Sequence, residues 1–279
     1  MAITLPYADS FDSYTDGSFR GATKGDWSGA NSADTLGNET NITSSAAHGT
    51  GKGVRWYARN AKNDNSGLIY TWLSSAVNEI WFRFYMRFQS GFAWSSQSEM
   101  KVIWFATDAG GGYPPVIFGL SRASCWDGRG GDERTDALYF WNQDHGDPDE
   151  GVCGSSNTGF TAINGGSTGD GLWHCYEVHW KKVDGSSDIE QVWIDGILKL
   201  DRQNLNLGTD WPKKLIEIFV NIDAPNNDPS ATVDLDDIAI SSNGRIGPVS
   251  SITKLQGITT IGGISKLNGV DWGSIKSVL

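Results

Sequence analysis

The sequence predicts an all-β protein with an antiparallel β-sandwich of the jelly-roll type. Three observations predict it. Apolar and polar residues alternate along many short segments, Gly, Asn, Asp and Ser separate these segments, and helical periodicity never extends beyond a turn or two. The chain has 279 residues, with 35 Gly and 8 Pro, which suits a single large sandwich with many tight turns.

Eleven segments show the alternation that is typical of strands. They are residues 54–59, 67–73, 79–88, 100–106, 115–121, 137–142, 172–183, 189–195, 197–200, 215–222 and 232–240. No segment between them resembles a crossover helix, so we expect antiparallel pairing. Residues 20–52, 122–136 and 143–170 are rich in Gly and polar residues. We expect them to be long loops, which either form a functional surface or only decorate the domain.

The character of the chain changes after Ile240. Residues 1–242 are predicted to form the sandwich, and residues 243–251 a linker. Residues 252–279 carry a short repeat, in which ITKLQGI is followed by ISKLNGV and then by IKSVL. One copy is too small to bury its own apolar side chains. The repeat segment is therefore predicted to be an attachment or oligomerisation tail, which packs on the sandwich, on its own copies or on a partner.

Charge and tryptophan content narrow the range of ligands. The net charge is −11, so we expect no general affinity for nucleic acid or for an anionic membrane. No apolar run reaches the roughly 18 residues that a transmembrane helix needs. The 13 tryptophans either fill the core or offer indole faces on which sugar rings stack.

The N-terminus and the cysteines bear on the compartment. The opening residues, MAITLPYADSF, lack the basic and apolar regions of a secretory signal. We expect that a signal was removed or that the protein does not use that route. The odd cysteine count does not fit a complete disulfide framework. Cys125 and Cys153 either pair or, together with Cys175, remain free thiols as in a reducing compartment.

Residues 80–88, IWFRFYMRF, show the clearest two-residue period. The core face is predicted to hold Phe82, Phe84, Met86 and Phe88. The opposite face is predicted to hold Trp81, Arg83, Tyr85 and Arg87. Arginine forks beside aromatic rings suit acidic or neutral sugars. The alternative is a solvated outer face on which these side chains cover one another.

Three further segments extend this pattern. Along residues 172–182, Tyr176, Val178 and Trp180 are predicted to face the core. The opposite face of that segment and of its neighbour carries Glu177, His179, Lys181 and Trp193. A carboxylate, an imidazole and an amine at alternate positions can transfer protons, or they can form a cross-strand charge network. Asp195-Gly196 predicts a two-residue hairpin turn, and Glu217 lies opposite the core positions of residues 215–222.

Two acidic segments predict a structural calcium site. They are DSFDSYTDG at residues 9–17 and VDLDDIAI at residues 233–240. The first and last strands of a jelly roll are commonly neighbours, so carboxylates from both could bind calcium through their oxygens. We expect Asp12 and Asp237 as ligands, unless these aspartates only accept hydrogen bonds in turns. No metal-type His or Cys spacing, phosphate loop or nucleophile elbow is present in the sequence.

Four stretches of the sequence together resemble the concanavalin A-like lectin/glucanase superfamily, in particular its polysaccharide lyase-like members. They are DSFDSYTDGS, NEIWFRFYMRF, LWHCYEVHWKKVDGSSDIEQVWIDGIL and VDLDDIAIS. The resemblance covers residues 5–242 and specifies fold better than activity. It implies a ligand groove on the concave sheet, and in a lyase a Tyr or His base beside groups that neutralise a uronate. These roles would fall to His179, Tyr85, Arg83 and Arg87, but the Gln-x-His and Tyr-x-Lys-x-Gly-x-Tyr strands have no match here, so we expect no catalytic residue.

The C-terminal repeat resembles the short tails of tailed-phage virion proteins. This implies a non-enzymatic surface or decoration protein of a virion, assembled in the host cytoplasm, with a lectin-like domain that can bind a glycan. Residues 252–279 would bind virion proteins or other copies of the chain. Two alternatives remain: an extracellular polysaccharide lyase acting on uronate-containing glycans, and a plain carbohydrate-binding module.

Overall fold

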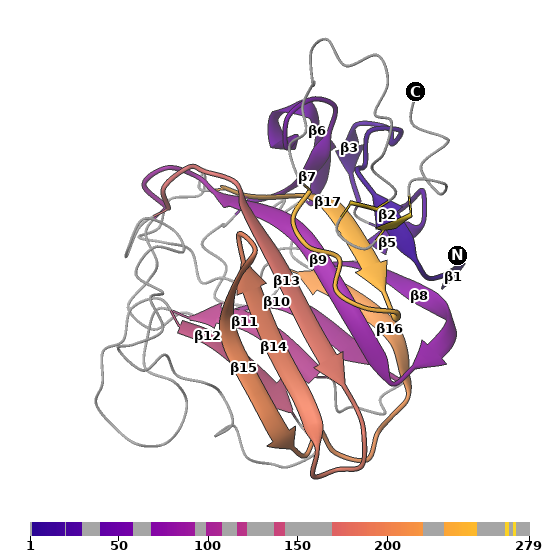
Figure 1. Cartoon of the computed structure of the whole chain (residues 1–279). Coiled ribbons are helices and arrows are strands. Elements are labelled where there is room, and N and C mark those ends of the chain that lie inside the picture. The colour runs from indigo at the N-terminus through magenta and orange to yellow at the C-terminus, as the bar shows by residue number, and fades with distance from the viewer. Residues whose placement is uncertain are drawn as a thin grey trace.

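A computed structural model gives the fold of the chain. It describes residues 2–19, 21–29, 40–57, 68–92, 99–107, 116–121, 137–142, 169–219, 232–249, 266–267 and 270–271. These residues form two packed β-sheets (Figure 1), which confirms the predicted antiparallel sandwich. Within the described part the only helical element is the 3-10 turn η1 (Ser44–Ala46), and no helix there is long and apolar enough to cross a membrane.

The first sheet has eight strands. In spatial order they are β12 (Ala137–Asn142), β11 (Val116–Ser121), β10 (Glu99–Ala106), β16 (Lys213–Phe219), β8 (Leu68–Val77), β5 (Trp27–Gly29) and β4 (Thr23–Lys24), with β1 (Ala2–Ile3) also paired to β8. All pairs are antiparallel except β1 with β8.

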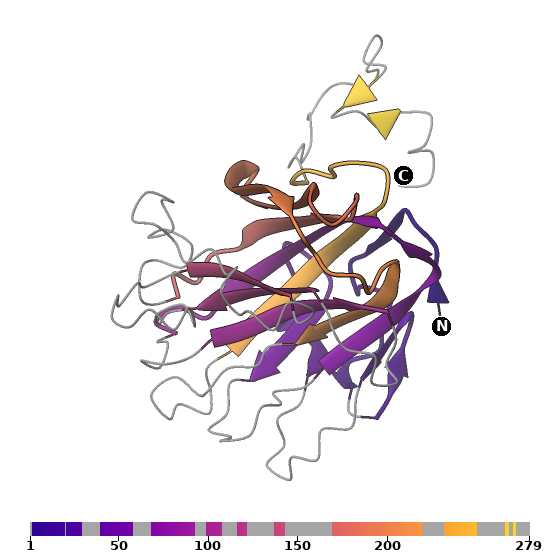
Figure 2. The same ribbon diagram turned by 90° about the horizontal axis from the view of Figure 1, so that it is seen from below.

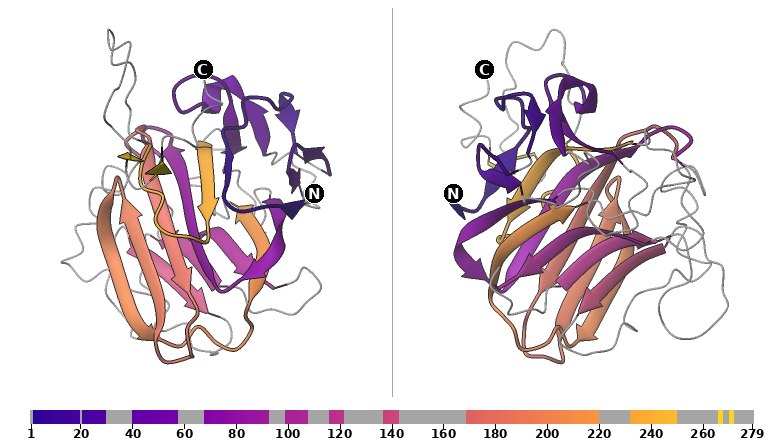
Figure 3. Two further views of the ribbon diagram at one scale, coloured as in Figure 1. Left: turned by 45° about the vertical axis from the view of Figure 1, so that its right-hand side comes forward. Right: turned by 180° about the vertical axis from the view of Figure 1, so that it is seen from behind.

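The second sheet has nine strands. In spatial order they are β15 (Ile197–Leu205), β14 (Asp188–Ile194), β13 (His174–Lys181), β9 (Glu79–Phe88), β17 (Thr232–Ser241), β7 (Gly53–Tyr57), β6 (Asn41–Thr43) and β3 (Gly17–Ser18), with β2 (Tyr7–Asp9) also paired to β17. The short N-terminal strands gather with β7 at one end of the sandwich (Figure 3).

All eleven predicted strands are present, with ends that differ by a few residues. The prediction that residues 20–52 form a loop is wrong, because β4, β5, β6 and η1 lie there. Strands of two or three residues contain too few alternations for a period to be read. The predicted loop 122–136 lies outside the described residues, as does nearly all of the loop 143–170.

The core lies between the two sheets and has the predicted composition. The four predicted core residues of β9 are at most 1% exposed, and Tyr176, Val178 and Trp180 of β13 are fully buried. Trp27 and Trp56 also belong to this core, so part of the tryptophan content serves packing. At the predicted hairpin turn between β14 and β15, Asp195 and Gly196 have φ angles of 51° and 80°, as a type I′ turn requires.

The chain does not leave the domain at once after β17. Residues 242–249 turn back and cross the outer side of the nine-stranded sheet (gold in Figure 2). Further on, β18 (Lys266–Leu267) and β19 (Val270–Asp271) pair with each other, and the rest of the predicted tail lies outside the described residues. Cys175 is a buried free thiol, whereas Cys125 and Cys153 also lie outside the described residues.

Candidate functional site

The structure places all eight predicted glycan-binding residues on the outer face of the nine-stranded sheet. The cross-strand register sets Trp81 beside His179 and Arg83 beside Glu177, which in turn lies beside Trp193. Six of the eight are nevertheless buried, namely Trp81, Arg83, Tyr85, Glu177, His179 and Trp193. Their contacts decide whether this surface can accept a ligand.

The His179 imidazole has protein partners on both ring nitrogens. Its Nδ1 lies 2.9 Å from Gln191 Oε1, and its Nε2 lies 3.0 Å from Glu79 Oε1. The ring also stacks on Trp81 at 3.8 Å between centroids, and burial lowers its pKa. Lys181 pairs with the same Glu79 at 3.1 Å. This corner of the sheet is a satisfied charge network, which is the second of the two outcomes the sequence allowed.

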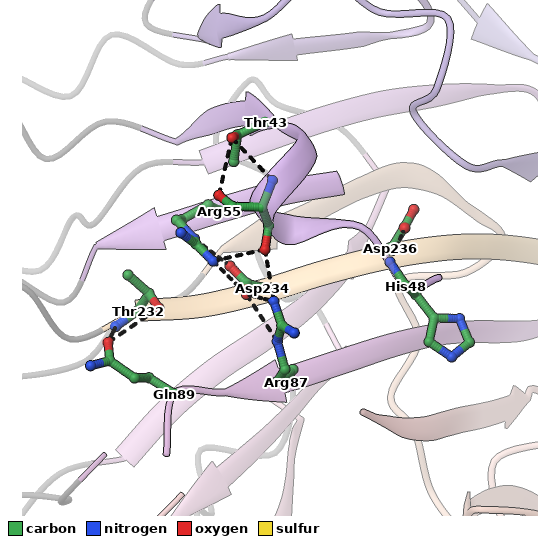
Figure 4. Close-up of polar contacts among 9 residues, drawn as sticks. Thr43, His48, Arg55, Arg87, Gln89, Thr232, Asp234 and Asp236 are labelled. Carbon is green, nitrogen blue, oxygen red and sulfur yellow. Dashed lines mark hydrogen bonds and ion pairs between the residues drawn. The ribbon is translucent and has the colours of Figure 1, made fainter. Parts of the chain in front are cut away.

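Arg87 belongs to a buried ion-pair cluster (Figure 4). The Asp234 carboxylate is 2% exposed and accepts from Arg55 Nε at 2.6 Å and from Arg87 Nη2 at 2.6 Å. Both guanidinium groups also donate to the Ser45 carbonyl. Asp234 and the Ser45 carbonyl therefore hold Arg87 in place, and because one carboxylate balances only one of the two guanidinium charges, the cluster keeps a net positive charge.

Tyr85 lies next to a histidine that the sequence analysis did not single out. His48 stacks on the Tyr85 ring at 4.0 Å, and its Nδ1 lies 2.8 Å from Asp237 Oδ2. Trp173 meets the His48 ring edge-on and lies under the Arg87 guanidinium. Burial raises the pKa of the Tyr85 hydroxyl, so the deprotonated form that would act as a base is harder to reach. His48 was missed because it falls in the segment that was predicted to be a loop.

The two predicted calcium ligands both have protein partners. Asp12 Oδ1 accepts from the Lys52 backbone N–H at 2.8 Å, and Asp237 pairs with His48. Asp236 directly precedes Asp237 in β17, and burial raises the pKa of Asp236 to about 8. No group of three or more His, Cys, Asp or Glu side chains is placed to hold a metal ion within the described residues, and the calcium site stays a prediction.

A second candidate surface lies on the outer face of the eight-stranded sheet. The register pairs Trp104 of β10 with Glu217 of β16, and Glu217 with Tyr70 of β8. The intervening residues Ile69, Ile103, Phe105, Ile216 and Ile218 belong to the core. The row Tyr70–Glu217–Trp104 consequently points away from the core, and all three side chains are half-buried.

The carboxyl group in this row is electrostatically unusual. Burial raises the pKa of Glu217, and within the described part of the chain no charged partner offsets this effect. In the next row Trp72 is half-buried too, with the Lys214 ammonium 5.5 Å from its ring centroid. Aromatic faces beside one polar group that has kept its hydrogen-bonding capacity are a typical lining of a binding surface. The strands were predictable, but the register that aligns the three residues was not.

No family model matches the sequence, and no curated protein matches it either. Solved structures do match. Alginate lyase Aly36B superposes with a TM-score of 0.55 at 17% identity, covering 88% of this chain and 100% of that one. A variant of it in complex with an alginate trisaccharide gives 0.54 and 15%, covering 85% and 99%. The cellulose-induced protein Cip1 gives 0.53 and 17%, covering 87% and 99%. The chain thus has the concanavalin A-like jelly-roll fold that the sequence resemblance implied.

Proposed function

We propose that this protein binds a polysaccharide on the outer face of its eight-stranded sheet. The observation that carries the proposal is the row Tyr70–Glu217–Trp104. Adjacent strands lie about 5 Å apart, so two strand spacings place the aromatic residues roughly 10 Å from each other. Two rings at that distance can stack on every second sugar of one extended chain, while the carboxyl between them can bond a hydroxyl of the sugar in the middle.

The availability of side chains favours this face over the one chosen from the sequence. On the nine-stranded sheet the polar groups of Arg83, Glu177 and His179 already have protein partners. A ligand there would have to replace those hydrogen bonds before it gained any of its own. Among the described residues, none makes a hydrogen bond to the Tyr70 or Glu217 side chain that a ligand would have to replace.

Charge favours a neutral glycan. The chain carries a net charge of −11, and the row presents a carboxyl whose pKa burial has raised. An acidic polymer would meet repulsion on approach and again at the site. The fold likeness supports a glycan ligand in general, because the similar structures include an alginate lyase in complex with an alginate trisaccharide and a cellulose-induced protein.

Affinity electrophoresis through gels containing a neutral β-glucan or alginate tests the proposal. We expect the full chain to be retarded by the glucan, and more weakly by alginate. Tyr70→Ala should abolish retardation, because stacking of a sugar ring on one aromatic side chain supplies a large share of the free energy of glycan binding. Leu198→Ala, which removes an exposed side chain of the other sheet, is the control. Unchanged migration of the wild type in every gel would refute glycan binding.

Lyase activity on uronate-containing glycans is the second candidate function, because alginate lyases are among the similar structures. The set drawn from the sequence is His179, Tyr85, Arg83 and Arg87. Each of these groups is held by protein contacts, so we expect no release of unsaturated uronate from alginate. Release that His179→Ala abolishes would overturn this expectation and assign catalysis to the nine-stranded sheet.

The virion role rests on the C-terminal repeat alone. The comparisons give it no support, and residues 252–279 are described only at β18 and β19. Attachment to virion proteins or to other copies through this tail, and a place on the virion surface, therefore stay predictions. Copurification of the protein with particles is the measurement that would establish them.

A further inference from the structure

Residues 245–249, which the sequence predicted to lie in a linker, are bound across the outer face of the nine-stranded sheet. Their main anchor is the Glu177 carboxylate of β13, which is 1% exposed. It accepts from the backbone N–H of Ile246 at 2.6 Å, from that of Gly247 at 3.1 Å and from Arg245 Nε at 3.2 Å. Among the described residues, every donor to this carboxylate comes from the 245–249 segment.

Arg245 is recognised by three different groups. Its guanidinium pairs with Glu177, donates through Nη2 to the Gly196 carbonyl at 3.1 Å, and lies 4.6 Å from the Trp193 ring centroid. A carboxylate, a carbonyl and an indole face together match the planar fork and the charge of arginine, and they match lysine less well. The contacts of this position therefore favour arginine over lysine.

The backbone beyond Arg245 is held as well. The Tyr85 hydroxyl accepts from the Val249 N–H at 2.8 Å, and Arg83 Nη1 approaches the Gly247 carbonyl at 3.5 Å. Gly247 has a φ of 76°, which is the left-handed region that favours glycine. The sheet thus binds the segment through several backbone groups and through one arginine side chain, as proteins bind peptides.

We propose that this face is a docking site for an arginine-containing peptide, which the chain's own residues 245–249 occupy, and that it anchors the C-terminal tail to the sandwich. The site suits this ligand, because among the described residues every hydrogen-bond donor to the Glu177 carboxylate belongs to residues 245–249. The tail then starts from a fixed point on the nine-stranded sheet. The contacts of residues 245–249 all lie on the nine-stranded sheet, so the proposal does not depend on glycan binding to the eight-stranded sheet.

Trypsin cleavage of the full chain after Arg245 tests the docking. Glu177→Gln leaves the sequence at the Arg245–Ile246 peptide bond unchanged, but it removes the negative charge that holds residues 245–249 on the sheet. A hydrogen bond to a charged group has a strength that corresponds to roughly a 10- to 100-fold change in an equilibrium. We expect cleavage at this bond to accelerate by about that factor. Lys199→Ala, a cation of β15 outside the contact, is the control and should leave the rate unchanged.

Amide hydrogen exchange keeps the proposal falsifiable if Glu177→Gln folds poorly. In the wild type, the amides of Ile246, Gly247 and Val249 should be protected. Arg245→Lys keeps the charge but loses the fork, and should lower the protection of Ile246 and Gly247 while circular dichroism stays unchanged. Wild-type amides that exchange as fast as in an unstructured peptide, or a cleavage rate that Glu177→Gln does not change, would overturn the proposal.

Discussion

At the scale of single residues, several charged side chains of the nine-stranded sheet have partners far away in the sequence. Asp234 holds Arg55 and Arg87 across separations of 179 and 147 residues. The period of two predicts which face these arginines occupy, because it depends only on local alternation. It cannot predict that the face is already occupied, because the partners come together only through the fold.

The Asp234 cluster should contribute strongly to stability. Replacing Asp234 with Ala leaves two guanidinium groups without their carboxylate. We expect a loss of about 3 kcal/mol in the free energy of unfolding, at the low end for breaking a buried pair because both arginines keep some access to water. Asp201→Ala, an exposed aspartate of β15, should cost less than about 1 kcal/mol. Urea denaturation followed by circular dichroism compares them, and equal losses would show that the cluster is not a stabilising unit.

His174 predicts a pH dependence of stability. Its Nδ1 lies 2.7 Å from Asp195 and its Nε2 2.9 Å from Asp170, and these hydrogen bonds raise its pKa from 6.5 to about 9. The folded state then binds the proton more tightly than the unfolded state. The stabilisation is fully present below pH about 6.5 and is lost as the pH rises through about 9.

Unfolding free energies measured across this pH window check the assignment. In the wild type they should fall as the pH rises, and in His174→Gln this part of the fall should be absent. A variant with the same pH slope as the wild type would show that His174 is not the titrating group.

At the scale of elements, long strands were predictable and short ones were not. The segments of β9 and β13 alternate over eight residues or more, so both their existence and their faces follow from the sequence. The end of β15 was missed because the polar run from Asp201 to Asn204 carries no apolar signal. The candidate site was likewise predictable only in part. The strands that carry Tyr70, Trp104 and Glu217 were predicted, but the alignment of these residues depends on pairing between segments that are distant in the sequence.

Phe84 of β9 tests the core assignment. Its ring is fully buried and stacks on Tyr176 at 5.4 Å. Phe84→Ala should lower the free energy of unfolding by about 3–5 kcal/mol through lost burial and a cavity, whereas Leu198→Ala, at an exposed position of β15, should have little effect. From the sequence alone Arg87→Ala would be a mild control, but its bonds to Asp234 make it unsuitable. A small effect at Phe84 in urea denaturation would contradict the core assignment.

At the scale of the whole molecule, the two outer faces of the sandwich differ in what they leave available. The nine-stranded face is covered by residues 245–249 and by its own ion pairs. The eight-stranded face keeps a half-buried row of two aromatic residues and a carboxyl that has no charged partner among the residues the structure describes. We infer a division of roles, in which one sheet holds the tail and the other meets the glycan.

Isothermal titration of a glycan that retards the wild type, against two tryptophan variants, tests this division most directly. Trp104 and Trp173 are both half-buried and lie on opposite outer faces, so their alanine variants are a matched pair. We expect Trp104→Ala to weaken binding by roughly 10-fold or more, as loss of an aromatic platform does, and Trp173→Ala to bind like the wild type. Normal binding by Trp104→Ala together with loss of binding by Trp173→Ala would contradict the account and move the site to the nine-stranded sheet.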